Sequence, residues 1–231
     1  MPFDRFYFDG KLEGTLTLQD PEHHHLERVM RVALGETIEL VNGKGDLAKA
    51  VVKAFSKKGA QLEVTHLDHE AAPSHLITLA IPLMRPSKLE WVLEKGTELG
   101  ADAVCLYAAD NSEKNDLSVN AVERLRHITI AALKQSGRLY LPSLSIVSAL
   151  EEVFVHEGIF LFGDVSPEAP WIQPASHEQT TLITGPERGF SENELQRLKA
   201  KATGIKLSPH ILRAETAPIA GISLLKSKAL I

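Results

Sequence analysis

The sequence has one cysteine and no long apolar run, and each shortage excludes a class of protein. Cys105 alone can form no intramolecular disulfide bond, which excludes a disulfide-stabilised secreted domain. No run of about 18 apolar residues occurs, so no membrane-spanning helix is expected. The first ten residues alternate charged and aromatic side chains and lack the apolar core of a secretory signal. We therefore expect a cytoplasmic protein.

Basic residues are in the minority, but they are not evenly spread. Lys and Arg total 25 against 30 Asp and Glu, which gives a net charge of -5. This balance argues mildly against a nucleic-acid partner. Residues 44–58, however, contain five lysines and a single acidic residue, Asp46. A local basic stripe is therefore compatible with the net negative charge of the chain.

Clusters of metal ligands are also scarce. His23, His24 and His25 are consecutive, and neighbouring positions on a helix point about 100 degrees apart, so they cannot converge on one ion. No group of cysteine and histidine with ligand spacing occurs elsewhere. We expect no bound metal.

Two kinds of pattern divide the 231 residues. Residues 1–72 contain short segments with strand-like alternation and one short helix at 21–32, which is typical of a small β-barrel or sandwich. From residue 73 apolar runs alternate with helical patterns, which predicts a mostly parallel sheet covered by helices. We therefore expect two domains, residues 1–72 and residues 73–231.

Two Ser-x-x-Glu patterns mark expected helix starts. Ser87 with Glu90, and Ser191 with Glu194, each match a capping box. In this motif the serine and glutamate side chains each accept a hydrogen bond from a free backbone N–H. We expect one helix to begin at each pair.

Residues 180–191, TTLITGPERGFS, form the first segment that points to chemistry. A buried strand is expected to end in a tight loop containing Gly185 and Gly189, before the helix capped by Ser191. Glycines let a backbone approach a ligand closely, and ligands of open α/β sheets bind outside the carboxyl ends of the strands. An ordinary strand-to-helix connection explains the same spacing equally well. The loop matches neither a dinucleotide-binding motif nor a P-loop.

Residues 206–217, KLSPHILRAETA, form the second such segment. The turn residues and aliphatic side chains from Leu207 to Leu212 suit an apolar pocket that also offers main-chain hydrogen bonds. Arg213 and Glu215 follow at the expected start of a helix. Taken alone, these two residues are explained more simply by a surface ion pair.

Together the two segments resemble the GPEGGFS and LGxxILRxETA motifs of the RsmE family, whose members methylate uridine N3 in small-subunit (16S) ribosomal RNA. Weaker matches are spread along the chain, at Arg5-Phe6, His24-His25-Leu26, Lys95 with Glu98-Leu99-Gly100, and Gln135-Ser136-Gly137-Arg138. The resemblance implies an α/β protein in which a SPOUT trefoil-knot domain follows a small PUA-like β-barrel domain. It also implies S-adenosyl-L-methionine as cofactor and a homodimer as the active unit.

The cofactor site of the family maps onto this chain by motif. The resemblance implies that the two loops and the end of an earlier strand surround the cofactor. The residues implied in this way are Phe162, Gly163, Ile183, Gly185, Glu187, Gly189, Leu207, Ser208, Ile211 and Leu212.

Three positions depart from the motifs of the family. Arg188 replaces the second glycine of GPEGG, Ser208 replaces the glycine after Leu207, and Asn111 replaces the arginine of an acidic-Arg-Ser element. We expect Arg188 either to narrow the cofactor loop or to project toward phosphate. The change at Asn111 is expected to remove a contact with RNA or substrate.

Methylation of uridine N3 requires loss of the imide proton while the acceptor is aligned with the methyl donor. We expect Arg213 to stabilise charge on the uracil or to anchor its phosphate, with Glu215 or Glu187 holding the arginine or accepting the proton. These roles make Arg213 and Glu215 the predicted catalytic residues.

Small-subunit ribosomal RNA, free or in the assembled subunit, is the expected partner of the first domain. Basic side chains there are expected to contact phosphates, although solvated lysines are the more common case. The residues concerned are Arg5, Arg28, Arg31, Lys44 and Lys49.

Two alternatives stay open. One is a SPOUT methyltransferase that modifies another RNA position. The other is a catalytically inactive RNA-binding relative whose cofactor pocket is blocked by Arg188.

Overall fold

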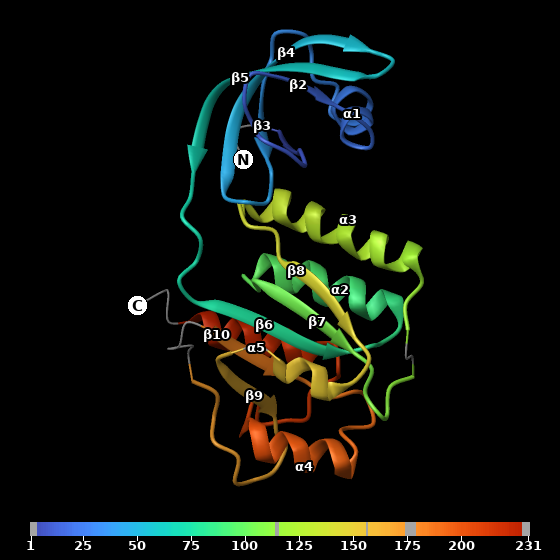
Figure 1. The fold of residues 1–231 in the computed structure, drawn as a ribbon, viewed down its shortest axis with the longest axis vertical. Coiled ribbons are helices and arrows are strands. Elements are labelled where there is room, and N and C mark those ends of the chain that lie inside the picture. The colour runs from blue at the N-terminus through green and yellow to red at the C-terminus, as the bar shows by residue number, and fades with distance from the viewer. Residues whose placement is uncertain (1–3, 114–115, 156, 174–178, 228–231) are drawn as a thin grey trace. The chain divides into compact units, whose positions relative to one another are not determined.

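A computed structural model describes residues 4–113, 116–155, 157–173 and 179–227. The chain divides into two compact units, which Figure 1 shows with their elements labelled. The first unit comprises residues 1–72 together with 133–141, and the second comprises 73–132 together with 142–231. The expected domains, 1–72 and 73–231, differ from these units in the placement of residues 133–141.

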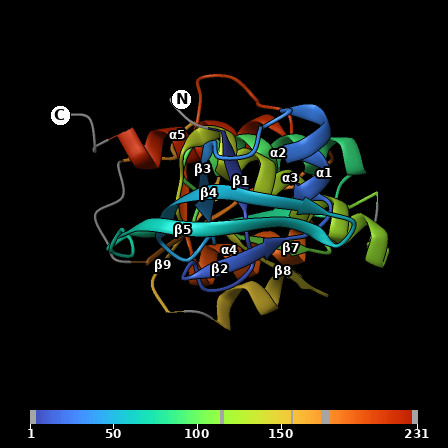
Figure 2. The same ribbon diagram turned by 90° about the horizontal axis from the view of Figure 1, so that it is seen from above.

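The first unit contains a five-stranded sheet. Its strands, in spatial order, are β1 (Arg5–Tyr7), β3 (Thr37–Val41), β4 (Asp46–Ser56), β5 (Gly59–His69) and β2 (Thr15–Leu18). The two longest strands, β4 and β5, are antiparallel and lie side by side (Figure 2). The sequence pattern predicts strands at 5–8, 15–18, 37–41, 47–55 and 60–67, and a strand is present at each. Their alternation places Leu40, Ala50 and Leu62 in a fully buried core.

The helix expected at 21–32 is shorter than its sequence pattern suggests. It consists of α1 (Glu22–His24) and a π-helical turn, η1 (His25–Val29). Its apolar side contributes Leu26, which is fully buried. The helix ends before Arg31, whose φ of 56° lies in the left-handed region and is incompatible with a continuing helix.

Residues 133–141 belong to the first unit because they are hydrogen-bonded to it. The backbone of Gly45 donates to the carbonyl of Leu139, and Leu141 donates to the carbonyl of Gly43, both at 2.9 Å. Lys134 adds an ion pair with Glu22 at 2.6 Å. These partners are distant in sequence, so no local pattern signals the pairing.

The second unit contains a six-stranded parallel sheet, as expected. Its strands, in spatial order, are β11 (Thr203–Ile205), β9 (Ile159–Gly163), β10 (Gln179–Ile183), β6 (Leu76–Pro82), β7 (Ala103–Tyr107) and β8 (Ser143–Val147). The apolar runs of the sequence predict strands at 75–83, 103–108, 158–163 and 181–185, but not the edge strands β8 and β11. Both are short, and both contain polar or glycine residues that give no apolar run.

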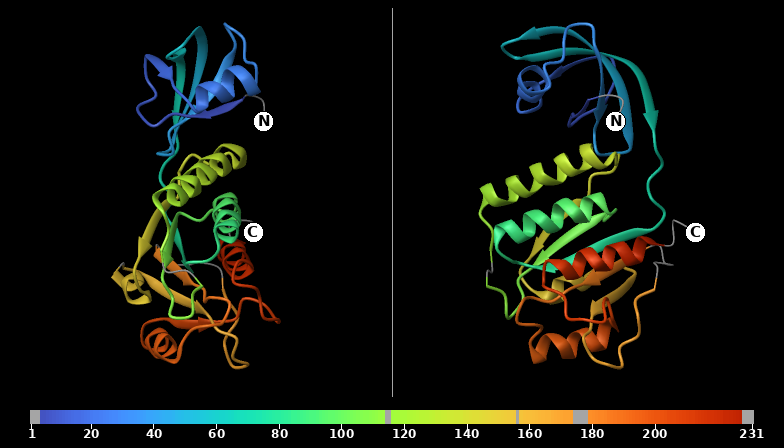
Figure 3. Two further views of the ribbon diagram at one scale, coloured as in Figure 1. Left: turned by 90° about the vertical axis from the view of Figure 1, so that its right-hand side faces the viewer. Right: turned by 180° about the vertical axis from the view of Figure 1, so that it is seen from behind.

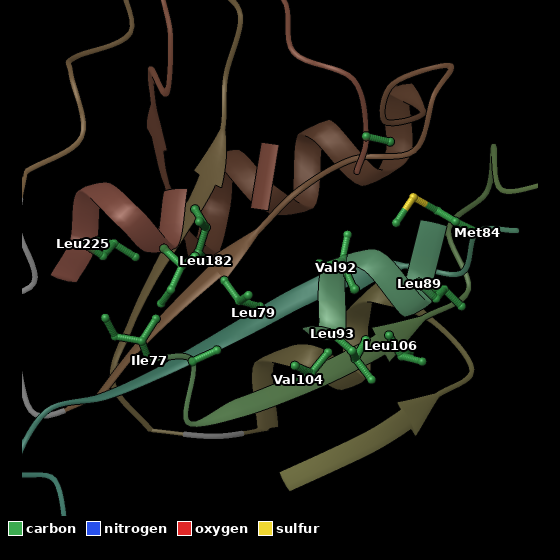
Figure 4. Packing of buried hydrophobic residues seen from close by; sticks show 14 of the residues in the cluster. Ile77, Leu79, Met84, Leu89, Val92, Leu93, Val104, Leu106, Leu182 and Leu225 are labelled. Carbon is green, nitrogen blue, oxygen red and sulfur yellow. The ribbon is translucent and has the colours of Figure 1, made fainter. Parts of the chain in front are cut away.

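Helices cover both faces of this sheet. One face packs against α2 (Pro86–Glu98) and α5 (Thr216–Lys226), which lie on the same side of the sheet in Figure 3. Figure 4 shows this core, where Val92 and Leu93 of α2 and Leu225 of α5 meet Leu79 and Leu182 of the strands. The other face packs against η2 (Leu150–Val155) and α4 (Glu192–Lys201). The remaining helix, α3 (Val119–Ser136), contributes Leu125 to the first of these cores.

The two predicted capping boxes have different outcomes. At α4 the prediction is confirmed: Ser191 accepts from the backbone N–H of Glu194, and the Glu194 carboxylate accepts from the backbone N–H of Ser191. At α2 the prediction is wrong, because the helix begins at Pro86, a residue suited to the first helical position. Glu90 instead pairs with Arg124.

The segment after β11 runs along the connection between β9 and β10. Lys206 donates to the carbonyl of Pro170 at 2.7 Å, and Ile172 donates to the carbonyl of Lys206 at 3.1 Å. This pairing brings the C-terminal segment against a loop from earlier in the chain, as the expected trefoil knot requires. Among the helices in the described part of the chain, none combines the length and apolarity needed to cross a membrane.

Candidate functional site

A pocket of about 1090 Å³ lies in the second unit, at the carboxyl ends of β9 and β10. Its walls include residues 163–167 from the last residue of β9 onward, residues 184–187, 189 and 190 after β10, and residues 206–215 and 217 up to the first turn of α5. The two segments singled out in the sequence, 180–191 and 206–217, therefore meet in space. A ligand site at the carboxyl ends of parallel strands is the position expected for an open α/β sheet.

Most of the predicted site residues line this pocket. The structure brings together there Gly163, Gly185, Glu187, Gly189, Leu207, Ser208, Ile211, Leu212, Arg213 and Glu215. Their roles in binding or catalysis remain predictions. Lys88, Asp164 and Thr184 also line the pocket and were not among the predicted residues.

Phe162 and Ile183 do not line the pocket, contrary to expectation. Phe162 is 2% exposed, and its ring packs edge-on against Phe190 at 6.3 Å between centroids. Ile183 is fully buried in the same core cluster. Neighbouring side chains of a strand point to opposite faces, so a residue beside a pocket residue can face the core instead.

The loop after β10 is shaped by its two glycines. A Cβ atom on Gly185 would lie 3.1 Å from the ring of Phe190, closer than an ordinary contact. Gly189 has a φ of 75°, a conformation that other residues rarely adopt. Both predicted glycines therefore have a structural reason for their position.

Residues after β7 hold this loop from outside the pocket. Asn111 Nδ2 donates to the carbonyl of Gly189 at 2.9 Å. Asp110 accepts a hydrogen bond from the hydroxyl of Ser191, and its backbone N–H donates to Glu194 at 3.1 Å. The change at Asn111, which we expected to remove a contact with RNA or substrate, therefore supplies a contact with the pocket loop.

The other two departures from the family motifs are also accommodated. Arg188 is exposed and lies outside the pocket lining, so it neither narrows nor blocks the pocket. Among non-glycine residues of the described chain, only Arg31 has a positive φ, so Arg188 and Ser208 replace glycine without left-handed strain. Ser208 Oγ also accepts a hydrogen bond from the backbone of His210 at 3.1 Å.

Lys88 pairs with two carboxylates of the pocket. Its Nζ lies 2.8 Å from Oε1 of Glu187 and 3.1 Å from Oε2 of Glu215. These carboxylates raise the pKa of the Lys88 ammonium above its usual value, so it stays protonated. Burial alone would raise the pKa of Glu215, but its own backbone N–H, Lys88 and Arg213 together lower it. Glu215 is therefore a stable anion and a weak proton acceptor.

Arg213 forms no ion pair or side-chain hydrogen bond with the residues that the structure describes. It is exposed and lines the pocket. The expectation that Glu215 or Glu187 holds this guanidinium is wrong, because Lys88 engages both carboxylates. Arg213 is therefore an uncommitted positive charge at the pocket wall.

Thr184 connects the end of β10 to the end of β7. Its carbonyl accepts a hydrogen bond from the Tyr107 hydroxyl at 2.7 Å, and burial raises the pKa of that tyrosine well above its usual value. The hydroxyl of Thr184 is buried and has no hydrogen-bond partner within the described residues. Oε2 of Glu215 likewise accepts no hydrogen bond there, since the Lys88 contact has only ion-pair geometry. Both atoms belong to residues that line the pocket.

The predicted RNA-contacting residues of the first unit differ in exposure. Arg28, Arg31, Lys44 and Lys49 are exposed. Arg5 is not available in the same way, because its side chain is 11% exposed and forms an ion pair with Glu39 at 2.6 Å. Its prediction as a phosphate contact is therefore not supported by its surroundings. Within the described residues, no group of three acidic, histidine or cysteine side chains is arranged to bind a metal.

Comparison with known proteins identifies both units. Residues 71–226 match the model of an RNA methyltransferase domain, and residues 18–65 match that of an RNA methyltransferase PUA domain. The ribosomal RNA small subunit methyltransferase E of Synechocystis sp. is 31% identical over 222 residues, covering 92% of this chain and 73% of the relative. The protein of the same name from Bacillus subtilis is 30% identical over 227 residues, covering 90% of this chain and 88% of the relative.

Solved structures agree with this similarity. The structure of a ribosomal RNA small subunit methyltransferase E from Neisseria gonorrhoeae, bound to S-adenosyl methionine, has a TM-score of 0.87 and 28% sequence identity. The match covers 98% of both chains. The expected fold class, a SPOUT-type α/β domain after a PUA-like domain, is confirmed. This chain is a member of the RsmE family of RNA methyltransferases.

Proposed function

We propose that this enzyme transfers the methyl group of S-adenosylmethionine to N3 of a uridine in small-subunit ribosomal RNA. The observation that carries the proposal is the meeting of residues 184–190 and 206–217 in one pocket with an uncommitted Arg213. The Neisseria gonorrhoeae relative, whose structure contains S-adenosyl methionine, supports the choice of cofactor. The names of the curated relatives support small-subunit ribosomal RNA as the substrate.

The pocket fits such a cofactor. Its volume of about 1090 Å³ slightly exceeds the range of about 300–1,000 Å³ for small-molecule sites, so a ligand of this size has room. Leu207, Ile211 and Phe190 offer apolar contacts to an aromatic base. The unpartnered Thr184 hydroxyl offers hydrogen-bonding capacity that a polar ligand would satisfy.

The chain's own residues then have simple tasks in the reaction. When bound, S-adenosylmethionine supplies an electrophilic methyl group on a sulfonium centre. Arg213 stabilises negative charge on the uracil as its N3 proton leaves to solvent. The two loops fix the direction from which the uracil approaches, so that binding also aligns N3 with the methyl group. We assign Glu215 a positioning role, since its lowered pKa makes it a poor general base.

We further propose that the enzyme acts in the cytoplasm as a homodimer. The family resemblance supports this, and Ile211, an apolar residue at the pocket, is 83% exposed in the single chain. Analytical ultracentrifugation of the purified chain tests the dimer. A sedimentation coefficient of a monomer at micromolar concentration would contradict it.

The reaction itself is tested with the purified chain, isotopically labelled S-adenosylmethionine and small-subunit RNA from cells that lack this gene. Digestion to nucleosides and mass spectrometry should detect labelled N3-methyluridine. The variant Arg213→Ala should lower the turnover number by roughly 100-fold or more while binding the cofactor normally. Label in another nucleoside would favour a different RNA position, and absence of both binding and transfer would favour an inactive relative.

A further inference from the structure

Lys88 carries a positive charge at a helix position where a positive charge is usually unfavourable. It lies in the first turn of α2, where the helix dipole favours acidic side chains and disfavours cations. No acidic residue is present in that turn. The ammonium is instead directed to two carboxylates that are 99 and 127 positions further along the chain, Glu187 and Glu215.

These two carboxylates come from the two loops that form the pocket. Glu187 belongs to the loop after β10, and Glu215 immediately precedes α5. The side chains are 29%, 29% and 18% exposed for Lys88, Glu187 and Glu215, so the triad is partly shielded from water. Shielding strengthens an ion pair relative to one at the surface. One lysine therefore connects both walls of the pocket.

The triad of Lys88, Glu187 and Glu215 also determines whether Arg213 has a carboxylate partner. Arg213 is two residues from Glu215, and its positive charge already contributes to lowering the pKa of that carboxyl. While Lys88 engages Glu215, the guanidinium has no carboxylate partner within the described chain. If Lys88 were absent, Glu187 and Glu215 would lose their cation, and Arg213 is the nearby guanidinium that would replace it.

We propose that Lys88 is a positioning residue: it occupies Glu187 and Glu215 so that Arg213 stays available to the uracil anion. This proposal rests on the proposed function of the pocket. It assigns Lys88 no direct contact with substrate. It also gives the carboxylates a definite role, since they fix Lys88 and the loops without accepting the proton.

The test compares Lys88→Met with Lys95→Met. Lys95 is a matched control, because it lies on the same helix and also pairs with two carboxylates, Glu94 and Glu98, at 2.7 and 2.8 Å. It does not line the pocket. We expect K88M to lower the turnover number for RNA methylation roughly 10-fold or more, and K95M to leave it unchanged.

Calorimetry with S-adenosylmethionine and with its neutral product, S-adenosylhomocysteine, provides a readout independent of activity. K88M removes a positive charge beside the pocket, so the affinity for the cationic cofactor should rise relative to that for the product. The ratio of the two affinities should not change in K95M.

A second variant separates positioning from simple structural support. In K88M combined with Glu187→Gln and Glu215→Gln, Arg213 has neither carboxylate to pair with, so turnover should recover at least part of the loss. A K88M protein with wild-type turnover and affinity ratio would overturn the proposal. So would a combined variant without either carboxylate that stays as slow as K88M. If the wild-type chain binds the cofactor but forms no N3-methyluridine, the proposed function fails instead.

Discussion

Gly221 in α5 offers a stringent test of how the pocket is supported. A Cβ atom at this position would lie 2.1 Å from Cδ2 of Leu182 in β10, and 3.5 Å from Cδ2 of Leu207 at the pocket. Carbon atoms pack at about 3.5–4.0 Å, so the helix or the leucine must move by about 1.4 Å. Leu182 is fully buried in the core of Figure 4, where any movement of its side chain displaces other packed residues.

The free energy of this change can be estimated for Gly221→Ala. Overpacking a core costs about 1–3 kcal/mol, and the severe contact places this case near the upper end. Alanine gains about 1 kcal/mol over glycine in a helix interior, which leaves a net loss of about 2 kcal/mol. For a protein of this size, that loss lowers the melting temperature by about 4–8 °C.

Gly96→Ala in α2 is the matched control for thermal unfolding followed by circular dichroism. Its added Cβ would lie 3.2 Å from the end of the Leu79 side chain, a contact that a small shift relieves. We expect this variant to melt within about 2 °C of the wild type, because helix propensity offsets the tighter packing. If G221A melts as high as G96A, α5 does not pack against β10 as described.

Three further predictions concern the pocket. Thr184→Val removes a buried hydroxyl without a partner, so the melting temperature should stay equal or rise, while calorimetry should show roughly 3–10-fold weaker cofactor binding. A lower melting temperature with unchanged affinity would contradict that role. Asn111→Ala removes the hydrogen bond to Gly189, worth about 1 kcal/mol, and should lower the melting temperature by about 2–4 °C and weaken cofactor binding several-fold. The lowered pKa of Glu215 stabilises the fold above its unfolded value of 4.5, and this stability is lost as pH falls through the lower folded value. Denaturant titrations of Glu215→Gln should therefore show a weaker loss of stability below pH 4.5 than the wild type, and identical curves would exclude the ion pair.

Local sequence patterns predicted the elements that depend on neighbouring residues. The capping box at Ser191 involves residues three apart, and the glycines at 185 and 189 act within one loop. The capping box at Ser87 failed because Pro86 offers a competing helix start one residue earlier. Both serines have the capping-box pattern, and the residues around each serine determine whether the capping box forms.

Long-range pairing explains what the sequence did not reveal. Lys88 meets its two carboxylates only after β10 and α5 have packed on the sheet. Its one local signal was a lysine in the first turn of a helix, against the dipole. Burial of Arg5 against Glu39 arises in the same way, because β1 pairs with a strand more than thirty residues later. The resemblance to the family motifs identified the residues of the pocket. Only the structure shows that Arg213 has no carboxylate partner within the described residues.

Hydrogen exchange with and without S-adenosylmethionine tests the central claim most directly, because it reports which backbone segments the cofactor covers. We expect slower exchange in residues 184–190 and 206–213 and unchanged exchange in the strands of the first unit. Protection confined to other segments, or no protection at saturating cofactor, would contradict a methyl-donor site built from these two turns.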